Sequence, residues 1–234
     1  MNIAEGKALV TGGSSGIGFD VARKLRERGA QVAICGRDRS KVEKAARDIG
    51  AVAITADVGN EEDVVRMVRT TIESLGGYDV LINNAGYGHF APLVDTTVEE
   101  MQRLFATNVF GAMLVARESA KYFVEKQRGN IINIASTAGQ RGFAGGTAYC
   151  ASKFALSAMT ECWRAELRKS NVRVMQVNPS EVQTRFFSAS GRGERTYSDR
   201  KLRGQEIAHA ILSMLEMDDR GFVTDLTVWA TNPD

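Results

Sequence analysis

The stretch Thr11-Gly12-Gly13-Ser14-Ser15-Gly16-Ile17-Gly18 indicates the fold class of this 234-residue chain. It follows the apolar run Lys7–Val10 and precedes residues 17–28, whose apolar side chains recur at helical spacing. A glycine-rich turn between a strand and a helix exposes backbone N–H groups at the positive end of the helix dipole, where a phosphate binds. The stretch therefore predicts a phosphate-binding turn, although a lone loop of this kind also occurs as an ordinary turn.

Three of the four glycines of this loop have different expected uses. Gly12 permits the tight turn, Gly16 lets the backbone approach a pyrophosphate, and Gly18 allows close packing of the helix on the strand. The other loop residues predicted to contact the same ligand are Ser14, Ser15 and Ile17.

Composition excludes several classes of protein. Apolar residues make up 44% and charged residues 25% of the chain, as in ordinary globular domains, and a net charge near +2 argues against a nucleic-acid partner. Three cysteines without metal-ligand spacing and two histidines predict neither a disulfide framework nor a metal site. The first strand is expected within a few residues of the start, which argues against a signal peptide. No apolar run is long enough to span a membrane, so we expect a soluble, cytoplasmic protein.

Strand-like and helix-like segments alternate along the whole chain. The expected strands are residues 8–11, 31–35, 52–55, 80–83, 130–135, 172–177 and 222–229. The expected amphipathic helices are residues 17–28, 39–48, 61–75, 97–126, 148–169 and 205–217. Alternation with nearly continuous apolar strands predicts an α/β fold: a single doubly wound, Rossmann-type domain over residues 1–234, with a seven-stranded, mainly parallel sheet and helices on both faces. In such folds the ligand binds beyond the carboxyl ends of the strands.

The residue after the second strand bears on the choice of dinucleotide. Where an NAD-binding fold usually carries an acidic residue for the ribose hydroxyls, this chain has Gly36-Arg37. The guanidinium of Arg37 suits a 2′-phosphate, because its planar fork donates two charge-assisted hydrogen bonds. We therefore expect NADP(H) in preference to NAD(H); the alternative is that Arg37 stacks on adenine while NAD binds.

Polar or small residues also follow the third, fourth and fifth strands. The further predicted cofactor contacts are Asp57, Val58, Asn84, Ala85 and Gly86. Ser136 follows the fifth strand, and Tyr149 and Lys153 are spaced so that they share one face of a helix. A lysine ammonium beside a phenol lowers the phenol's pKa, and a phenol tuned in this way exchanges a proton with an alcohol oxygen. Taken alone, the Tyr-x-x-x-Lys spacing is common by chance.

The chain resembles the short-chain dehydrogenase/reductase family over nearly its whole length. The resemblance is carried by residues 11–18, Asn83-Asn84-Ala85-Gly86, Asn108-Val109-Phe110-Gly111, Ser136, Tyr149-Cys150-Ala151-Ser152-Lys153 and Asn178-Pro179, in the family's order. It implies that Tyr149 is the general acid/base and that Ser136 orients the substrate carbonyl. It further implies that Lys153 binds the nicotinamide ribose and tunes Tyr149, and that Asn108 holds a water that connects Lys153 to solvent. Val182 and Thr184 resemble the family's contacts to the nicotinamide carboxamide.

The resemblance implies an NADP-preferring oxidoreductase that interconverts a ketone or aldehyde and an alcohol. Reduction of a 3-oxoacyl thioester on acyl-carrier protein is the leading specific alternative, and a non-catalytic nucleotide-binding regulator is the alternative from another class. The family also implies a homodimer or homotetramer, for which the long apolar segments 97–126 and 148–169 supply surface, including Phe110, Met113, Leu114, Phe154, Leu156 and Met159. Pro179-Ser180 replaces the family's Pro-Gly, Ser15 stands where many NADP-preferring relatives have a basic residue, and the usual C-terminal motif is absent.

The sequence does not name the small-molecule substrate. Residues 184–204 are polar, glycine-bearing and rich in arginine, and we expect them to form a lid over the substrate site, with a solvated loop as the alternative. The candidates for lining the substrate site are Tyr87, His89, Phe90, Gln140, Phe143 and Phe186.

Overall fold

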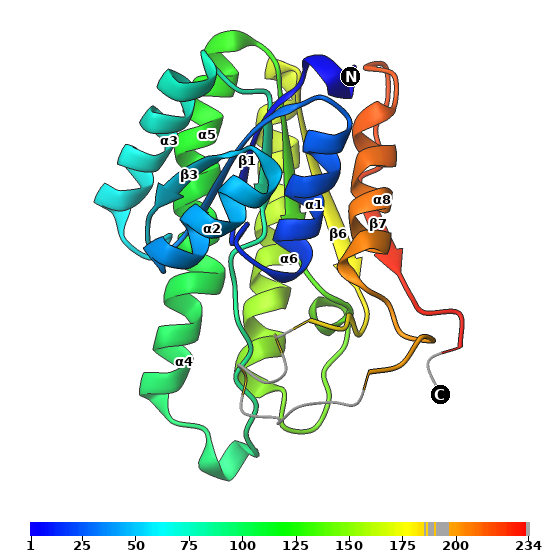
Figure 1. The fold of residues 1–234 in the computed structure, drawn as a ribbon. Coiled ribbons are helices and arrows are strands. Elements are labelled where there is room, and N and C mark those ends of the chain that lie inside the picture. Colours follow the sequence, from blue (N-terminus) through cyan, green and yellow to red (C-terminus); the bar gives the residue numbers. More distant parts are fainter. Residues whose placement is uncertain (185, 187–189, 191–196, 233–234) are drawn as a thin grey trace.

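The computed structural model describes residues 1–184, 186, 190 and 197–232. Seven strands form one sheet in the order β3-β2-β1-β4-β5-β6-β7, and every pairing is parallel, which confirms the predicted doubly wound α/β fold (Figure 1). The strands are β1 Lys7–Thr11, β2 Gln31–Gly36, β3 Val52–Thr55, β4 Val80–Asn83, β5 Gly129–Ile134, β6 Val172–Pro179 and β7 Asp225–Val228. Strand order reverses between β1 and β4, so the loops after these two strands diverge and leave a crevice.

Helices cover both faces of the sheet. They are α1 Gly16–Glu27, α2 Arg39–Ile49, α3 Glu61–Leu75, α4 Val98–Phe105, α5 Ala112–Lys126, α6 Thr147–Leu167 and α8 Gly204–Glu216. Short 3₁₀ turns occupy Ile3–Glu5, Leu93–Asp95, Thr137–Gly139 and Arg168–Ser170. Most boundaries lie within one or two residues of the predicted ones, whereas β7 is shorter than the predicted 222–229.

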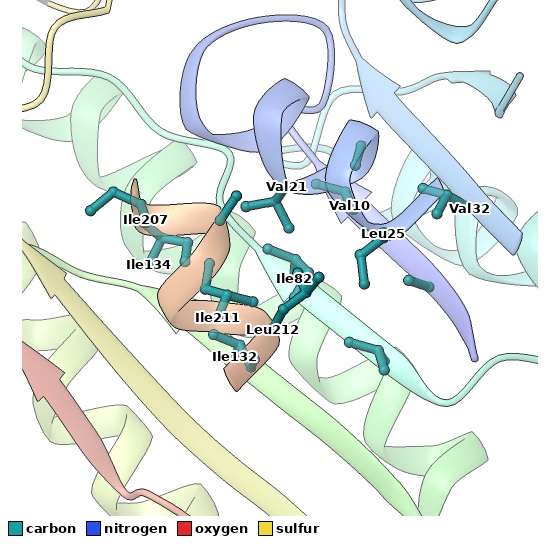
Figure 2. Close-up of a cluster of buried hydrophobic side chains, with 14 of the residues drawn as sticks. Val10, Val21, Leu25, Val32, Ile82, Ile132, Ile134, Ile207, Ile211 and Leu212 are labelled. Carbon is teal, nitrogen blue, oxygen red and sulfur yellow. The ribbon is translucent and has the colours of Figure 1, made fainter. Parts of the chain in front are cut away.

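The apolar core has two layers because the strands are buried on both sides. On one face α1, α2 and α8 pack on the sheet. Figure 2 shows this layer, with Val21 and Leu25 of α1 and Ile211 and Leu212 of α8 gathered around Ile82 of β4. On the other face α3 and α5 pack on the alternate strand residues, among them Leu9, Leu81 and Ile131. One helix of each layer begins at a conventional cap: Asp38 accepts a hydrogen bond from the N–H of Lys41 at the start of α2, and Asn60 accepts one from the N–H of Asp63 at the start of α3.

The predicted helix 97–126 is interrupted. Between α4 and α5 the chain forms a π-helical turn, Ala106–Gly111, so the two helices are continuous but out of phase. Gly111 permits this turn to lie against the loop after β3, because a Cβ there would be 2.9 Å from Cγ2 of Val58. The π turn carries Asn108 into the protein, where its side chain is 2% exposed.

The outward apolar surface is smaller than the sequence suggested. Leu114 and Leu156 belong to the core, and Met113 and Met159 pack against it. Phe110 and Phe154 are 56% and 45% exposed. Within the described residues, no helix combines the length and the hydropathy that crossing a bilayer requires.

Candidate active site

A cavity of about 760 Å³ opens at the carboxyl ends of the strands, at the lower edge of the sheet in Figure 1. Nearly all of the predicted site residues line it: Gly12, Ser14, Ser15, Gly16, Ile17, Arg37, Asp57, Val58, Asn84, Ala85, Gly86, Ser136, Tyr149, Lys153, Val182 and Thr184. Gly18 and Asn108 lie behind this lining. One cavity therefore joins the glycine loop to the Tyr149 end of α6.

The glycine loop has the geometry of a phosphate cradle. Gly12 and Gly16 have φ values of 63° and 56°, which L-residues with side chains rarely adopt. A Cβ on Gly18 would lie 2.5 Å from both Nδ2 of Asn84 and the carbonyl oxygen of Gly12, so close packing requires glycine there. Within the described part of the chain, Ser15 gives no side-chain cap to the first turn of α1, which leaves that helix terminus to a ligand.

The loop after β4 is tied to the glycine loop by side-chain hydrogen bonds. Oγ1 of Thr11 accepts from the N–H groups of Asn84 and Ala85, each over 2.9 Å. Nδ2 of Asn84 donates to the carbonyl oxygen of Thr11 over 2.9 Å. Asn84 thus holds the glycine loop and the loop after β4 together through its amide, a use that the sequence did not indicate.

At the end of β2, Arg37 and Asp38 have different surroundings. Asp38 caps α2 by accepting from the N–H of Lys41, and it also pairs with the Lys41 ammonium at 2.9 Å. These hydrogen bonds lower the pKa of the exposed Asp38 carboxyl to about 2. Arg37 is exposed, lines the cavity and forms no salt bridge with any described residue. The Asp38 carboxylate is therefore already paired with α2, while the Arg37 guanidinium is available to a ligand in the cavity.

Ser136, Tyr149 and Lys153 come together where β5 and β6 meet α6. Lys153 is 7% exposed, and its Nζ donates to the carbonyl oxygen of Ile134 over 2.8 Å. Oγ of Ser136 accepts from the N–H of Ala138 over 3.1 Å and is hydrogen-bonded to the Tyr149 phenol. The serine and the phenol, distant in sequence, thus share one hydrogen bond.

The two titratable groups respond differently to burial. Burial raises the pKa of Tyr149 to about 12, with the Ser136 hydrogen bond acting in the opposite direction. Burial lowers the pKa of Lys153 to about 8. Nζ of Lys153 donates to a backbone carbonyl and lies 5.9 Å from the phenol ring centroid. The expected lowering of the phenol pKa by Lys153 stays a prediction. At neutral pH the phenol keeps its proton and the amine is charged.

The side chain of Asn108 forms hydrogen bonds within the protein that the sequence did not predict. Its Nδ2 donates to the carbonyl oxygen of Tyr87 over 2.9 Å and to Oγ of Ser152 over 3.2 Å, while its Oδ1 accepts from the N–H of Tyr87. The carboxamide therefore fixes the backbone after β4 against α6. Its role in holding a water stays a prediction.

The candidates for the substrate side divide into two groups. Tyr87, Phe90, Phe143 and Phe186 line the cavity. His89 and Gln140 do not: Nε2 of His89 lies 3.1 Å from a carboxylate oxygen of Glu100, and Gln140 donates to Thr227 over 3.1 Å. Glu181, which sequence reasoning missed, lines the cavity and pairs with Lys201 at 2.8 Å; its place after β6 was the available signal.

Much of the predicted lid, 184–204, falls on residues 185, 187–189 and 191–196, outside the described residues. The segments on either side are joined. Val182 and Leu202 form a parallel bridge, and the N–H of Gln183 donates to the carbonyl oxygen of Leu202 over 2.7 Å. Nε2 of Gln183 donates to the carbonyl oxygen of Ser198 over 2.6 Å. These contacts hold Val182 beside the cavity.

Comparisons with known proteins agree with this geometry. Residues 6–195 match the model of the family described as short chain dehydrogenase. An uncharacterized oxidoreductase of Staphylococcus epidermidis is 30% identical over 228 residues, which cover 97% of each chain. The alcohol dehydrogenase of the archaeon Thermococcus sibiricus, solved with 5-hydroxy-NADP, superposes with a TM-score of 0.88 at 25% identity over 96% of each chain. A 3-ketoacyl-(acyl-carrier-protein) reductase of Brucella melitensis, solved with NADH, gives 0.89 at 28% identity over 97% of this chain and 98% of its own.

Proposed function

The chain belongs to the short-chain dehydrogenase/reductase family of NAD(P)-dependent oxidoreductases, and from that premise we propose that it interconverts a ketone or aldehyde and the corresponding alcohol. The observation that carries the proposal is the meeting of Ser136, Tyr149 and Lys153 in the cavity that also contains the glycine loop. A regulator that only binds a nucleotide has no chemical need for this set of side chains.

The residues present fit a nicotinamide dinucleotide. The left-handed glycines and the open terminus of α1 suit a pyrophosphate, and Lys153, Val182 and Thr184 would hold the nicotinamide half. When bound in its reduced form, this cofactor supplies a hydride, that is, two electrons and a proton nucleus, to the carbonyl carbon. No described cluster of His, Cys, Asp and Glu side chains is arranged to hold a metal.

The chain's own residues would then orient and protonate the substrate oxygen. Ser136 donates a hydrogen bond to the substrate oxygen and orients it, and Tyr149 gives that oxygen its phenolic proton as the C=O π bond is lost. A phenol whose pKa is about 12 is fully protonated near neutral pH, which suits the reducing direction. The charged amine of Lys153 favours the phenolate that remains. The phenolate then regains a proton from solvent.

We further propose a preference for NADP(H). The exposed guanidinium of Arg37 can bind a 2′-phosphate, and Asp38, the acidic group beside it, is engaged with α2. This support is independent of the solved relatives, which include complexes with both a 5-hydroxy-NADP and NADH.

A second candidate substrate class is a 3-oxoacyl thioester. It is favoured by the likeness to the 3-ketoacyl-(acyl-carrier-protein) reductase of Brucella melitensis. We also propose a homodimer or homotetramer in the cytoplasm, supported by the exposed rings of Phe110 and Phe154 on neighbouring elements.

The direct test is a screen of NADPH and NADH oxidation against a panel of ketones, aldehydes and a 3-oxoacyl thioester. We expect at least one carbonyl to be reduced with stoichiometric oxidation of the nucleotide. Tight nucleotide binding, measured by fluorescence, without turnover on any carbonyl or on the matching alcohols would contradict the proposal and support the regulator.

A further inference from the structure

Three phenylalanine rings from separate parts of the chain form one cluster with the phenol ring of Tyr149: two of them pack on the phenol ring, and the third packs on one of these two. Phe90 lies between β4 and α4, Phe143 between β5 and α6, and Phe186 beyond β6, and all three line the cavity. The ring centroids of Phe90 and Phe186 lie 5.3 and 5.4 Å from that of Tyr149, and each ring is inclined to it by 59°. The proton donor is therefore set in an aromatic wall.

The rings of this wall also contact one another. Phe90 meets Phe186 edge-on, with centroids 6.4 Å apart and planes at 71°, and it meets Phe143 at 6.0 Å with planes at 34°. Tilted and edge-to-face arrangements are the favourable ones for aromatic pairs, because the positive ring edge meets the negative face of its neighbour. A further flat ring entering the cavity can join the same pattern.

Two glycines seat the rings directly on the backbone. A Cβ at Gly88 would lie 2.7 Å from Cζ of Phe186 and 2.8 Å from Cε2 of Phe90. A Cβ at Gly146 would lie 2.8 Å from Cε2 of Phe143. Since each ring packs against the main chain, the wall is formed before any ligand binds, and little ordering of side chains is required on binding.

The cations of the described cavity lining either lie at its phosphate side or donate to the backbone. Among the described lining residues the cations are Arg37, Lys41 and Lys153. Arg37 and Lys41 follow β2, at the phosphate side of the cavity, and Lys153 donates to the carbonyl oxygen of Ile134. The described surroundings of Tyr149 thus offer apolar contact to a substrate rather than a counter-ion for a carboxylate.

We propose that the substrate carries a flat apolar ring: an aryl-substituted ketone or aldehyde in the reducing direction and the aryl-substituted alcohol in the other. This inference rests on the proposed oxidoreductase function and assigns Phe90, Phe143 and Phe186 as specificity-determining residues. In reduction the carbonyl carbon gains a hydride from the reduced nicotinamide nucleotide, and the oxygen gains the proton of Tyr149. The C=O π bond is replaced by C–H and O–H bonds, and the nucleotide is oxidised by two electrons.

Phenylacetone and cyclohexylacetone are a matched pair of probes, because their carbonyls are unconjugated and the rings differ chiefly in flatness. We expect the wild type to prefer phenylacetone in kcat/KM by about 2- to 10-fold, the range of aromatic pair energies. Phe143→Leu keeps an apolar side chain but removes the flat ring, so it should bring this ratio close to one. Phe154→Leu is the control, since Phe154 is 45% exposed against 44% for Phe143 and lies outside the cavity lining.

A second readout needs no turnover. With the oxidised nucleotide present, saturation-transfer NMR should detect phenylacetone's ring protons on the wild type and on Phe154→Leu, and much less on Phe143→Leu. Equal or better use of cyclohexylacetone or of acetoacetate, or an unchanged ratio in Phe143→Leu, would overturn the inference while leaving the oxidoreductase function intact. Ring binding that depends on Phe143, without reduction of any carbonyl, would instead support the aromatic site and contradict the proposed function.

Discussion

Nζ of Lys153 donates to the carbonyl oxygen of Ile134, the last residue of β5, over 2.8 Å. This bond anchors the first turns of α6 to the carboxyl edge of the sheet. The same ammonium lies 5.9 Å from the Tyr149 ring centroid, so its hydrogen bond goes to the sheet and its effect on the phenol is through space. The lysine therefore positions the helix that carries the proposed proton donor.

Replacing Tyr149 by phenylalanine should remove the proton donor and keep the ring. Because general acid/base groups typically contribute about 10²- to 10⁴-fold, turnover on a good carbonyl substrate should fall by that factor. Nucleotide affinity, measured by calorimetry, should stay nearly constant. Tyr122→Phe, which removes a phenol hydroxyl outside the cavity lining, is the matched control. Wild-type turnover in Tyr149→Phe, with the chemical step rate-limiting, would refute the assignment.

Replacing Arg37 by alanine should weaken NADPH binding and leave NADH binding nearly unchanged. A charge-assisted hydrogen-bonded site contributes about 1.5–3 kcal/mol, so the NADPH affinity should fall by about 10- to 100-fold. Arg39→Ala removes a charge of the same sign two residues away, where the guanidinium instead pairs with Glu43. Calorimetry on both variants checks this, and a wild type that binds NADH as tightly as NADPH would contradict it.

The buried amine of Lys153 should make stability depend on pH. Its pKa is about 8 in the folded protein and 10.5 when exposed, so the unfolded state binds more protons between these values and stability rises with pH. Lys153→Met removes this titration. The free energy of unfolding of the wild type relative to Lys153→Met should therefore rise by about 1 kcal/mol from pH 7 to pH 9.

Denaturant titrations at the two pH values measure this difference. Comparing the two proteins cancels Cys35, whose pKa burial raises to about 12, because that thiol is present in both. A difference that is constant or that falls over this pH range would show that the amine is not destabilised by burial.

Removing the Asn108 carboxamide should destabilise the loop after β4. Asn108→Ala leaves the backbone N–H and carbonyl of Tyr87 without these partners, which should cost about 1–3 kcal/mol in the free energy of unfolding. Ser152→Ala removes one of the bonds of Asn108 and should cost less, about 1 kcal/mol. Thermal or denaturant unfolding measures the loss of stability in each variant. A larger loss in Ser152→Ala than in Asn108→Ala would contradict this account.

A charge on the exposed apolar surface should disrupt the proposed oligomer. Phe110→Glu and Phe154→Glu place a carboxylate where the proposed self-complementary contact would bury it, so light scattering should give a smaller mass than for the wild type. Val94→Glu, at a site that is 90% exposed in the loop before α4, is the control. A wild type that scatters as a monomer at micromolar concentration would refute the proposed assembly.

Local sequence patterns were sufficient to predict the helices and strands and most of the residues that line the cavity. Strand–helix alternation predicted the parallel sheet, because a strand buried on both faces must be apolar throughout. The predicted α3, 61–75, matches the structure at both ends, since Asn60 caps its start and Gly76 ends it in a left-handed conformation. The glycine loop and Tyr149 were predicted as site residues because phosphate binding and proton transfer each require specific residue types at fixed spacing.

The π turn at Ala106–Gly111 could not be predicted in this way. Its residues are compatible with a continuous helix, and the break depends on how the turn packs against Val58 and Tyr87. The burial that raises the pKa of Tyr149 could not be predicted for a similar reason: spacing places a lysine one turn away, but the burial of the phenol and the partner of the ammonium are properties of the folded chain.

The sequence by itself thus determined the order of strands and helices along the chain and the position of the glycine-rich turn, because these depend on neighbours within a few residues. It also supplied the proposed reacting side chains. The tertiary structure alone decided that Asn84 bonds to Thr11, that Asn108 bonds to Tyr87, and that Phe90 and Phe186 pack on Tyr149 while Phe143 packs on Phe90. Those relationships join residues far apart in the chain. They exist only once the parallel sheet has brought the carboxyl ends of its strands to one edge.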